Sequence, residues 1–119
     1  MKIAVTSSGD TLDSAVDPRF GRAAKFVVFD TETGESHAVD NSQNVQMAQG
    51  AGIQAAGTIA RLGVQCLITG HCGPKAFRTL SAAGVEIFVG GEGTVREALD
   101  AHKAGKLQSA SGPDVRGHW

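Results

Sequence analysis

Residues 48–69 read AQGAGIQAAGTIARLGVQCLIT, and the hydrophobic period changes within this stretch. Its first part carries apolar residues three or four positions apart, the spacing of one helical face, at Ala48, Ala51, Ala55, Ile59 and Leu62. Gly63 follows the last of them, as at many helix C-termini. Residues 64–69 are then nearly continuously apolar, which is typical of a strand covered on both faces. The stretch predicts a helix packed on a sheet, followed by a strand in the middle of that sheet.

Three strands are expected before this helix. Residues 2–7 (KIAVTS) and 25–30 (KFVVFD) are short runs rich in β-branched and aromatic residues, and 35–40 (ESHAVD) follows the turn TETG at 31–34. That turn is typical of a hairpin, so the second and third strands should be antiparallel. Residues 8–24 carry Gly, Pro and Asp without an apolar period, which predicts a long surface loop. Loops of this length are usually functional or disordered.

Two further helices and one strand are expected after the central strand. Pro74 suits the first position of a helix that ends before Gly84, and residues 85–89 form the last apolar run. Thr94 with Glu97 three residues later forms a capping box that opens the final helix. The predicted order is β-β-β-α-β-α-β-α. It indicates an α/β protein with a five-stranded mixed sheet flanked by helices and with right-handed crossovers.

Composition restricts the class of protein. The chain has 119 residues, which is the size of one domain. Eleven Lys and Arg against 12 Asp and Glu give a formal net charge of −1, so no basic field draws the protein to nucleic acid. Hydrophobic residues make up 41% and charged residues 19%, a balance that favours a packed core over disorder.

Cysteine usage and hydropathy favour a cytoplasmic protein. The two cysteines, Cys66 and Cys72, cannot form a disulfide framework, and no leader pattern opens the chain. No apolar run approaches the roughly 20 residues that cross a bilayer, so we expect no membrane span. Cys66 lies among apolar neighbours and is interpreted as a core residue. The fold is expected to occupy residues 1–108, and 109–119, which lose periodicity, are expected to be a flexible tail.

Three loops are expected to meet at one edge of the sheet. If the first, fourth and fifth strands are parallel, the loops that follow them emerge at the same carboxyl edge, where open α/β sheets place ligands. These loops are residues 7–22, which begin with Ser7 and Ser8, residues 70–75, and residues 90–94. We therefore expect a ligand site among them.

The first loop carries Arg19 and Arg22 on either side of Phe20 and Gly21. Two cations beside a glycine allow a loop to wrap an anion with the help of backbone N–H groups. The alternative is a pair of solvated arginines, or ion pairs to Asp13 or Asp17, of the kind that contribute little to stability.

The second loop places His71 and Cys72 between a strand and a helix N-terminus, with Lys75 in the first turn of that helix. Imidazole nitrogen and thiolate sulfur are ligands for copper, zinc or iron, and a helix N-terminus favours negative charge. Two adjacent ligands do not complete a metal site, which normally needs about four. The alternative is a turn histidine beside a half-buried thiol.

The third loop, GGEGT at residues 90–94, could hold an anion at a helix start. It lacks the Lys-Ser/Thr ending of a nucleotide-binding P-loop, and a tight turn between strand and helix is the alternative. The chain contains no G-x-S-x-G, H-E-x-x-H or C-x-x-C motif. These absences argue against hydrolase, zinc-protease and dithiol chemistry.

Four segments together resemble the dinitrogenase iron-molybdenum cofactor family. They are KIAVTS at residues 2–7, VDPRFGRA at 16–23, ITGHCGPKAF at 68–77, and GGEGTVREAL at 90–99. The resemblance covers nearly all of residues 1–108. It implies a three-layer ribonuclease H-like fold and a protein that binds, carries or helps to assemble molybdenum-containing metal–sulfur clusters.

Within that family, the D-P-R-F-G-R motif of a short stand-alone chain is most similar to members from anaerobic sulfate-reducing bacteria that hold a molybdenum–copper sulfide cluster non-covalently. Such a cluster is a large, soft anion, suited to cationic side chains, to helix-start N–H groups, and to the apolar and polarisable surface that Phe20 and Met47 are expected to supply. Direct metal ligation is expected, if anywhere, at His71 and Cys72. The candidate cofactor-binding residues are Ser7, Ser8, Arg19, Phe20, Arg22, Met47, His71, Cys72, Lys75, Gly91 and Gly93.

Three alternatives remain beside this non-enzymatic carrier. The first is a carrier or assembly accessory for an iron–molybdenum cofactor, although nitrogenase-associated members often carry His where this chain has Arg19. The second is an enzyme that uses Cys72 as a nucleophile with His71 as its base. The third is a regulatory partner module of a cytoplasmic ATPase complex, by analogy with family members.

Overall fold

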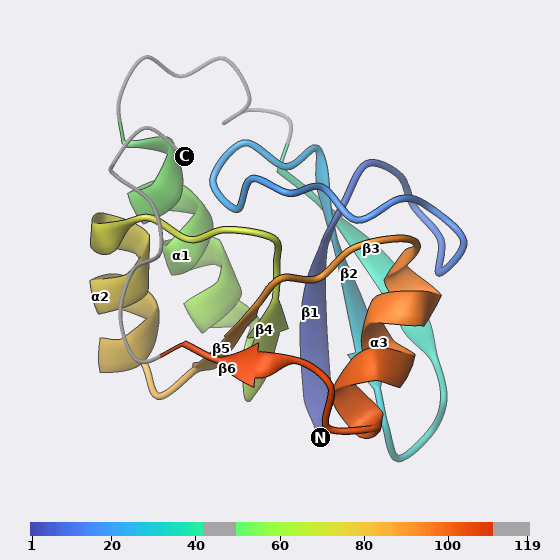
Figure 1. Ribbon diagram of the computed structural model, residues 1–119. Coiled ribbons are helices and arrows are strands. Elements are labelled where there is room, and N and C mark those ends of the chain that lie inside the picture. The colour runs from blue at the N-terminus through green and yellow to red at the C-terminus, as the bar shows by residue number, and fades with distance from the viewer. Residues whose placement is uncertain (42–49, 111–119) are drawn as a thin grey trace.

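A six-stranded mixed sheet forms the centre of the fold, in the order β3-β2-β1-β4-β5-β6 (Figure 1). The computed structural model describes residues 1–41 and 50–110. β1 pairs in parallel with β4, and β4 with β5, whereas the β1–β2, β2–β3 and β5–β6 pairs are antiparallel. The strands are β1 (Lys2–Ser7), β2 (Lys25–Asp30), β3 (Ser36–Asp40), β4 (Cys66–Ile68), β5 (Glu86–Val89) and β6 (Gln108–Ser109). The predicted α/β class and mixed sheet are confirmed.

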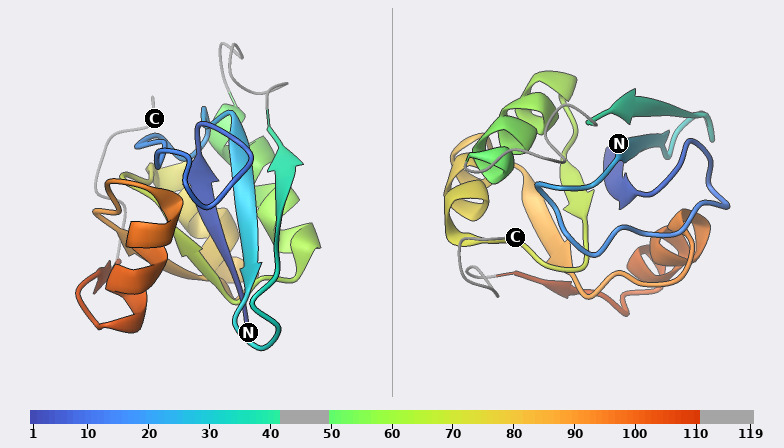
Figure 2. Two further views of the ribbon diagram at one scale, coloured as in Figure 1. Left: turned by 90° about the vertical axis from the view of Figure 1, so that its right-hand side faces the viewer. Right: turned by 90° about the horizontal axis from the view of Figure 1, so that it is seen from above.

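Helices cover both faces of this sheet. α1 (Ala51–Leu62) and α2 (Pro74–Ala82) pack side by side on one face, and α3 (Val95–Lys103) lies on the other (Figure 2). Two clusters of buried apolar residues result. The larger contains Phe26, Leu67 and Ile59 on the α1 and α2 side, and the smaller contains Val5, Ile68 and Val95 on the α3 side. The sheet is therefore the middle of three layers.

The local sequence signals mark the ends of the elements. Gly63 follows α1 in the left-handed conformation, with φ of 70°, which is the conformation that glycine adopts at low cost. Pro74 opens α2. Thr94 Oγ1 accepts the Glu97 N–H at 3.1 Å, while the Glu97 carboxylate accepts the Thr94 N–H at 2.9 Å. These three predictions are confirmed.

The sheet has one strand more than the five predicted. β6 pairs with β5 through Phe88↔Ser109 and Val89↔Gln108, and Ala110 N–H donates to Ile87 O at 2.7 Å. The segment is too short and too polar to show a strand period, so only the neighbouring edge of β5 specifies it. β6 therefore crosses the boundary that we predicted, between residues 108 and 109, for the end of the folded domain and the start of the tail. Residues 111–119, the rest of the predicted tail, lie outside the described residues.

Thr94→Ala is expected to lower the free energy of unfolding by about 1 kcal/mol, because the α3 N-terminus loses a side-chain cap. Urea denaturation followed by circular dichroism measures the change. The matched control is Thr79→Ala within α2, whose hydroxyl bonds to Lys75 O at 3.0 Å in its own helix and is expected to contribute little. Equal losses in the two variants would contradict the cap assignment.

Candidate functional site

The carboxyl ends of β1, β4 and β5 lie at one edge of the sheet, and the three predicted loops meet there (Figure 2). Residues 8–24 cross this edge and pair with both other loops. His71 N–H donates to Pro18 O at 2.8 Å, and Phe20 N–H donates to His71 O at 3.4 Å. Val16 N–H donates to Gly93 O at 2.9 Å. The predicted convergence of the three loops is therefore present.

Two glycines allow the first loop to lie directly against its neighbours. A Cβ on Gly70 would be 2.7 Å from Pro18 Cα and Pro18 O, and a Cβ on Gly21 would be 2.7 Å from Gly52 N in the first turn of α1. Neither space admits a side chain, because the nearest atoms belong to the backbone. Any residue larger than glycine would push the loop away from β4 or from α1.

The buried Phe20 side chain holds the first loop against the hydrophobic core. Its ring is 0% exposed and stacks on Phe26, with ring centroids 5.8 Å apart. The side chain expected to offer apolar surface to a ligand thus lies in the hydrophobic core. Its neighbours Arg19 and Arg22 lie at the surface, exposed and half-buried respectively. The ring therefore fixes the backbone that carries the two arginines.

Buried polar side chains also hold this loop, and sequence reasoning missed them. Thr6 Oγ1 donates to Asp17 O at 2.7 Å and lies 3.1 Å from Thr69 Oγ1, and both threonines are 0% exposed. The buried Asn41 donates to Ala23 O at 2.7 Å. The available signal was a threonine at the end of each of two adjacent parallel strands, Thr6 on β1 and Thr69 after β4.

Two aspartates lie near the arginines of the first loop, and their partners within the described residues can be identified. Asp13 pairs with Arg96 at 3.2 Å, and the Asp17 carboxylate accepts the backbone N–H of Arg19 at 3.1 Å. Among the described residues, neither Asp13 nor Asp17 forms an ion pair with Arg19 or Arg22. The alternative in which these aspartates neutralise the two arginines is therefore wrong for the described part of the chain.

Helix termini add further positive potential to this edge. α1 and α2 both begin there (Figure 1), and within the described residues neither N-terminus has a side-chain cap. Their first-turn N–H groups have no partner within the helix, and the helix dipole places partial positive charge beside them. Lys75, exposed in the first turn of α2, lies at the same end. The edge therefore favours an anion.

The third loop differs because several N–H groups within it and in the following first turn of α3 are already bonded. Val95 N–H donates to Ser14 O at 2.9 Å, and Arg96 N–H donates to Leu12 O at 2.8 Å. Gly91 N–H donates to Thr69 O at 3.0 Å, and Gly93 takes up a φ of 77° beside the capping box. Residues 90–94 thus form a tight turn that supports the first loop. A tight turn between strand and helix was the alternative interpretation of this segment.

His71 and Cys72 face different surroundings. His71 is half-buried at the edge, whereas Cys72 is 1% exposed in the core beneath the first loop, with Sγ 3.7 Å from Gly73 O. Among residues 1–41 and 50–110, no group of three or more His, Cys, Asp or Glu side chains could hold a metal ion. Cys66, as predicted, is a buried core residue.

The remaining candidates divide by accessibility. Ser7 is buried, and its hydroxyl donates to Gly9 O at 2.8 Å. Ser8 is exposed on the first loop. Met47 lies outside the described residues. Among the candidate residues that the structure describes, the accessible side chains at this edge are Ser8, Arg19, Arg22, His71 and Lys75.

Both thiols are expected to react slowly in the native protein. Cys72 is buried, and burial together with the nearby Glu86 charge raises the pKa of the Cys66 thiol, so little thiolate forms at pH 8. Alkylation of Cys66→Ala and Cys72→Ala variants by iodoacetamide, with and without urea, measures each thiol separately. Native rates at least about a hundredfold below those in urea are expected. Fast native labelling of Cys72 would instead support the nucleophilic enzyme.

The described part of the chain thus combines a mixed sheet, three helices and a cationic edge formed by loops, and comparison with known proteins assigns the chain to a family. The chain matches the dinitrogenase iron-molybdenum cofactor family over residues 1–105 and belongs to it. It is 30% identical over 111 residues to an uncharacterized protein of Methanocaldococcus jannaschii, covering 91% of this chain and 90% of that protein. The predicted family is confirmed.

Two solved structures are similar over most of their length. The apo form of the orange protein from Desulfovibrio gigas is 47% identical, with 96% of each chain covered and a TM-score of 0.92. A putative NifB protein from Thermotoga is 39% identical, with 91% of each chain covered and a TM-score of 0.80. In the described part of this chain, no helix has the length and apolar character needed to span a bilayer.

Proposed function

We propose that this protein is a non-enzymatic cytoplasmic carrier of a molybdenum–copper sulfide cluster, held as an anion at the carboxyl edge of the sheet. The observation that carries the proposal is the presence at one edge of Arg19, which pairs with His71, of Lys75, and of the N-termini of α1 and α2, which have no side-chain cap within the described residues. The strand order β3-β2-β1-β4-β5 is also compatible with the ribonuclease H-like fold that the family resemblance implies. Residues 1–108 would act as one cluster-binding domain.

The chemistry of this edge suits a sulfide-rich anion better than a bare cation. Guanidinium groups donate several hydrogen bonds in a fixed plane, and helix-start amides add donors without a counter-charge. His71, at the same edge, can donate a hydrogen bond to sulfide or contribute one ligand to copper. Because Cys72 Sγ is buried, cluster retention would depend on charge and hydrogen bonding more than on thiolate ligation.

Anaerobic reconstitution tests the proposal. The purified protein is mixed with tetrathiomolybdate and a cuprous salt, desalted, and analysed by visible absorption and by mass spectrometry for metals. We expect molybdenum and copper to remain bound in a fixed ratio, with a sulfide-to-metal absorption band. Lysozyme desalted in parallel controls for non-specific adsorption.

Other outcomes of the reconstitution would favour one of the alternative functions. Retention of iron with molybdenum, but not of copper with molybdenum, would replace this proposal with an iron–molybdenum carrier or assembly accessory. Loss of every metal combination, together with a stable complex with an ATPase-type partner, would replace it with a regulatory partner module.

A further inference from the structure

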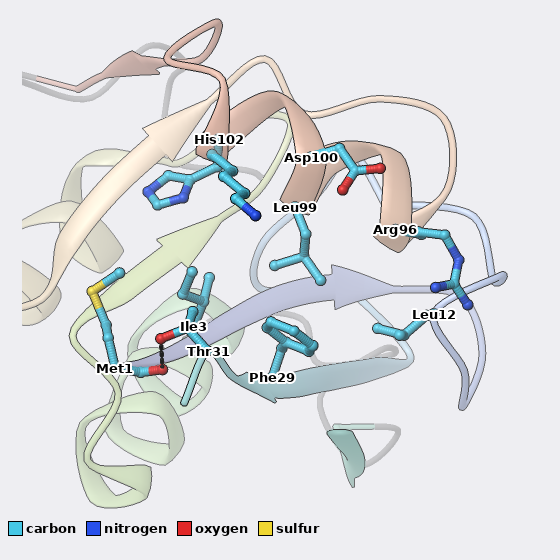
Figure 3. Close-up of a pocket in the computed structure, with 10 residues that line it drawn as sticks. Met1, Ile3, Leu12, Phe29, Thr31, Arg96, Leu99, Asp100 and His102 are labelled. Atoms are coloured by element: carbon cyan, nitrogen blue, oxygen red, sulfur yellow. Dashed lines mark hydrogen bonds between the residues drawn. The ribbon is translucent and has the colours of Figure 1, made fainter. Parts of the chain in front are cut away.

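A concave site lies on the α3 side of the sheet, away from the edge proposed to bind the cluster. It is a cavity of about 450 Å³, a volume within the range of small-molecule sites. Its lining residues come from the start of β1, the end of β2, the first loop and α3 (Figure 3). None of them is a candidate cluster-binding residue, so this cavity is a separate site.

The interior of the cavity is apolar. Figure 3 shows the Leu99 side chain pointing from α3 toward the Phe29 ring on β2, with Ile3 and Leu12 on either side. Leu12, Phe29 and Leu99 are only half-buried. Met1, at one end, is 41% exposed and is one of two large hydrophobic side chains exposed in the described part of the chain. An apolar ligand would remove this surface from water.

The lining of the cavity also carries more basic than acidic side chains. Arg96, His102 and Lys103 line the cavity together with a single carboxylate, Asp100. Arg96 Nε pairs with Asp13 at 3.2 Å, which leaves its terminal nitrogens to donate elsewhere. The His102 ring packs edge-on against Phe88, with ring centroids 4.6 Å apart. Among the described residues, no carboxylate forms an ion pair with Lys103.

We propose that this cavity binds a small amphipathic carboxylate, with its hydrocarbon body between Leu99 and Phe29 and its carboxylate at Lys103 and His102. The apolar side chains of the lining select the body of such a ligand, and the basic side chains select its charge. An apolar alcohol of equal length would contact the same apolar side chains but would leave the basic groups without an anionic partner. The carboxylate therefore separates this proposal from simple hydrophobic adsorption.

Decanoate and decanol are the probes, titrated into the full-length protein and followed by amide chemical shifts in NMR spectra. We expect decanoate to shift the amides of Phe29 and Leu99 with a dissociation constant of about 1 mM or below, and decanol to bind at least fivefold more weakly. Absence of shifts at these residues, or equal affinity for the two probes, would overturn the proposal.

Two variants and a matched control complete the test. Leu99→Trp fills the cavity and is expected to weaken decanoate at least tenfold. Lys103→Glu, at an exposed position in the last turn of α3, is expected to weaken decanoate at least fivefold and to leave decanol unchanged. Arg78→Glu on α2 makes the same charge change on the other face and should alter neither probe. A loss of decanoate affinity in Arg78→Glu equal to that in Lys103→Glu would overturn the assigned contact.

Discussion

The double variant Arg19→Ala/Arg22→Ala is expected to bind the molybdenum–copper sulfide cluster at least about tenfold more weakly than the wild-type protein. A charge-assisted hydrogen bond contributes about 1.5–3 kcal/mol, and about 1.4 kcal/mol corresponds to one factor of ten. The two side chains flank Phe20 on a loop fixed by backbone bonds to His71. Their removal would leave Lys75 and the helix termini as the remaining positive groups.

Salt dependence provides a second measurement of the same effect. Solvent-exposed charges are screened over about 8–10 Å at 0.10–0.15 M salt, so wild-type affinity should fall steeply between 0.05 and roughly 0.5 M salt. The fall should be shallower in the double variant, which has fewer charges to screen. Metal retention after desalting at each salt concentration measures both slopes.

A matched charge control and a thiol variant test the assignment. Arg61→Ala/Arg78→Ala removes the same net charge from exposed positions on α1 and α2 and should change the affinity by less than about twofold, since screening weakens distant charges. Cys72→Ala should also have a modest effect, because the thiol is buried. A strong loss in Cys72→Ala with little loss in Arg19→Ala/Arg22→Ala would reverse the assignment in favour of direct ligation.

The elements of the fold that local chemistry specifies were predictable. Helix boundaries depend on residues close to them in the sequence, here Gly63, Pro74 and the Thr94–Glu97 pair. The sequence alone therefore predicts these boundaries. β6 was not predictable, because Gln108 and Ser109 are polar and form a strand only where β5 offers an unpaired edge. Residues close in the sequence therefore determine these helix boundaries, whereas pairing with a strand distant in the sequence determines β6.

The meeting of the three loops was predictable from topology, but the surroundings of each side chain were not. Parallel strands place their following loops at one edge, and that rule alone brought Arg19 and His71 together. An irregular loop has no period, so nothing in the sequence showed that Phe20 and Cys72 point into the core. The close approaches at Gly21 and Gly70 were hidden for the same reason, because they depend on backbone atoms distant in the chain.

Phe20→Ala is expected to have the largest effect on stability, a loss of about 3–5 kcal/mol in the free energy of unfolding. The ring is fully buried against Phe26, so truncation leaves a cavity beneath the first loop. Domains of this size are stable by about 5–15 kcal/mol, so the variant should fold with a lower melting temperature. Urea denaturation measures the loss, and Phe20→Leu, which keeps part of the volume, should show a smaller one.

Phe20→Ala should also weaken cluster binding, because the ring fixes the backbone between Arg19 and Arg22. Ile87→Ala is the matched control: Ile87 is 2% exposed in the same core cluster but lies on β5, and its truncation costs a similar 2–5 kcal/mol. Cluster retention at a temperature where both variants are folded separates stability from positioning. Affinity should fall in Phe20→Ala and persist in Ile87→Ala, since only the first variant frees the loop that carries the arginines. Equal affinities in the two variants would mean that the arginines hold their positions without the Phe20 anchor.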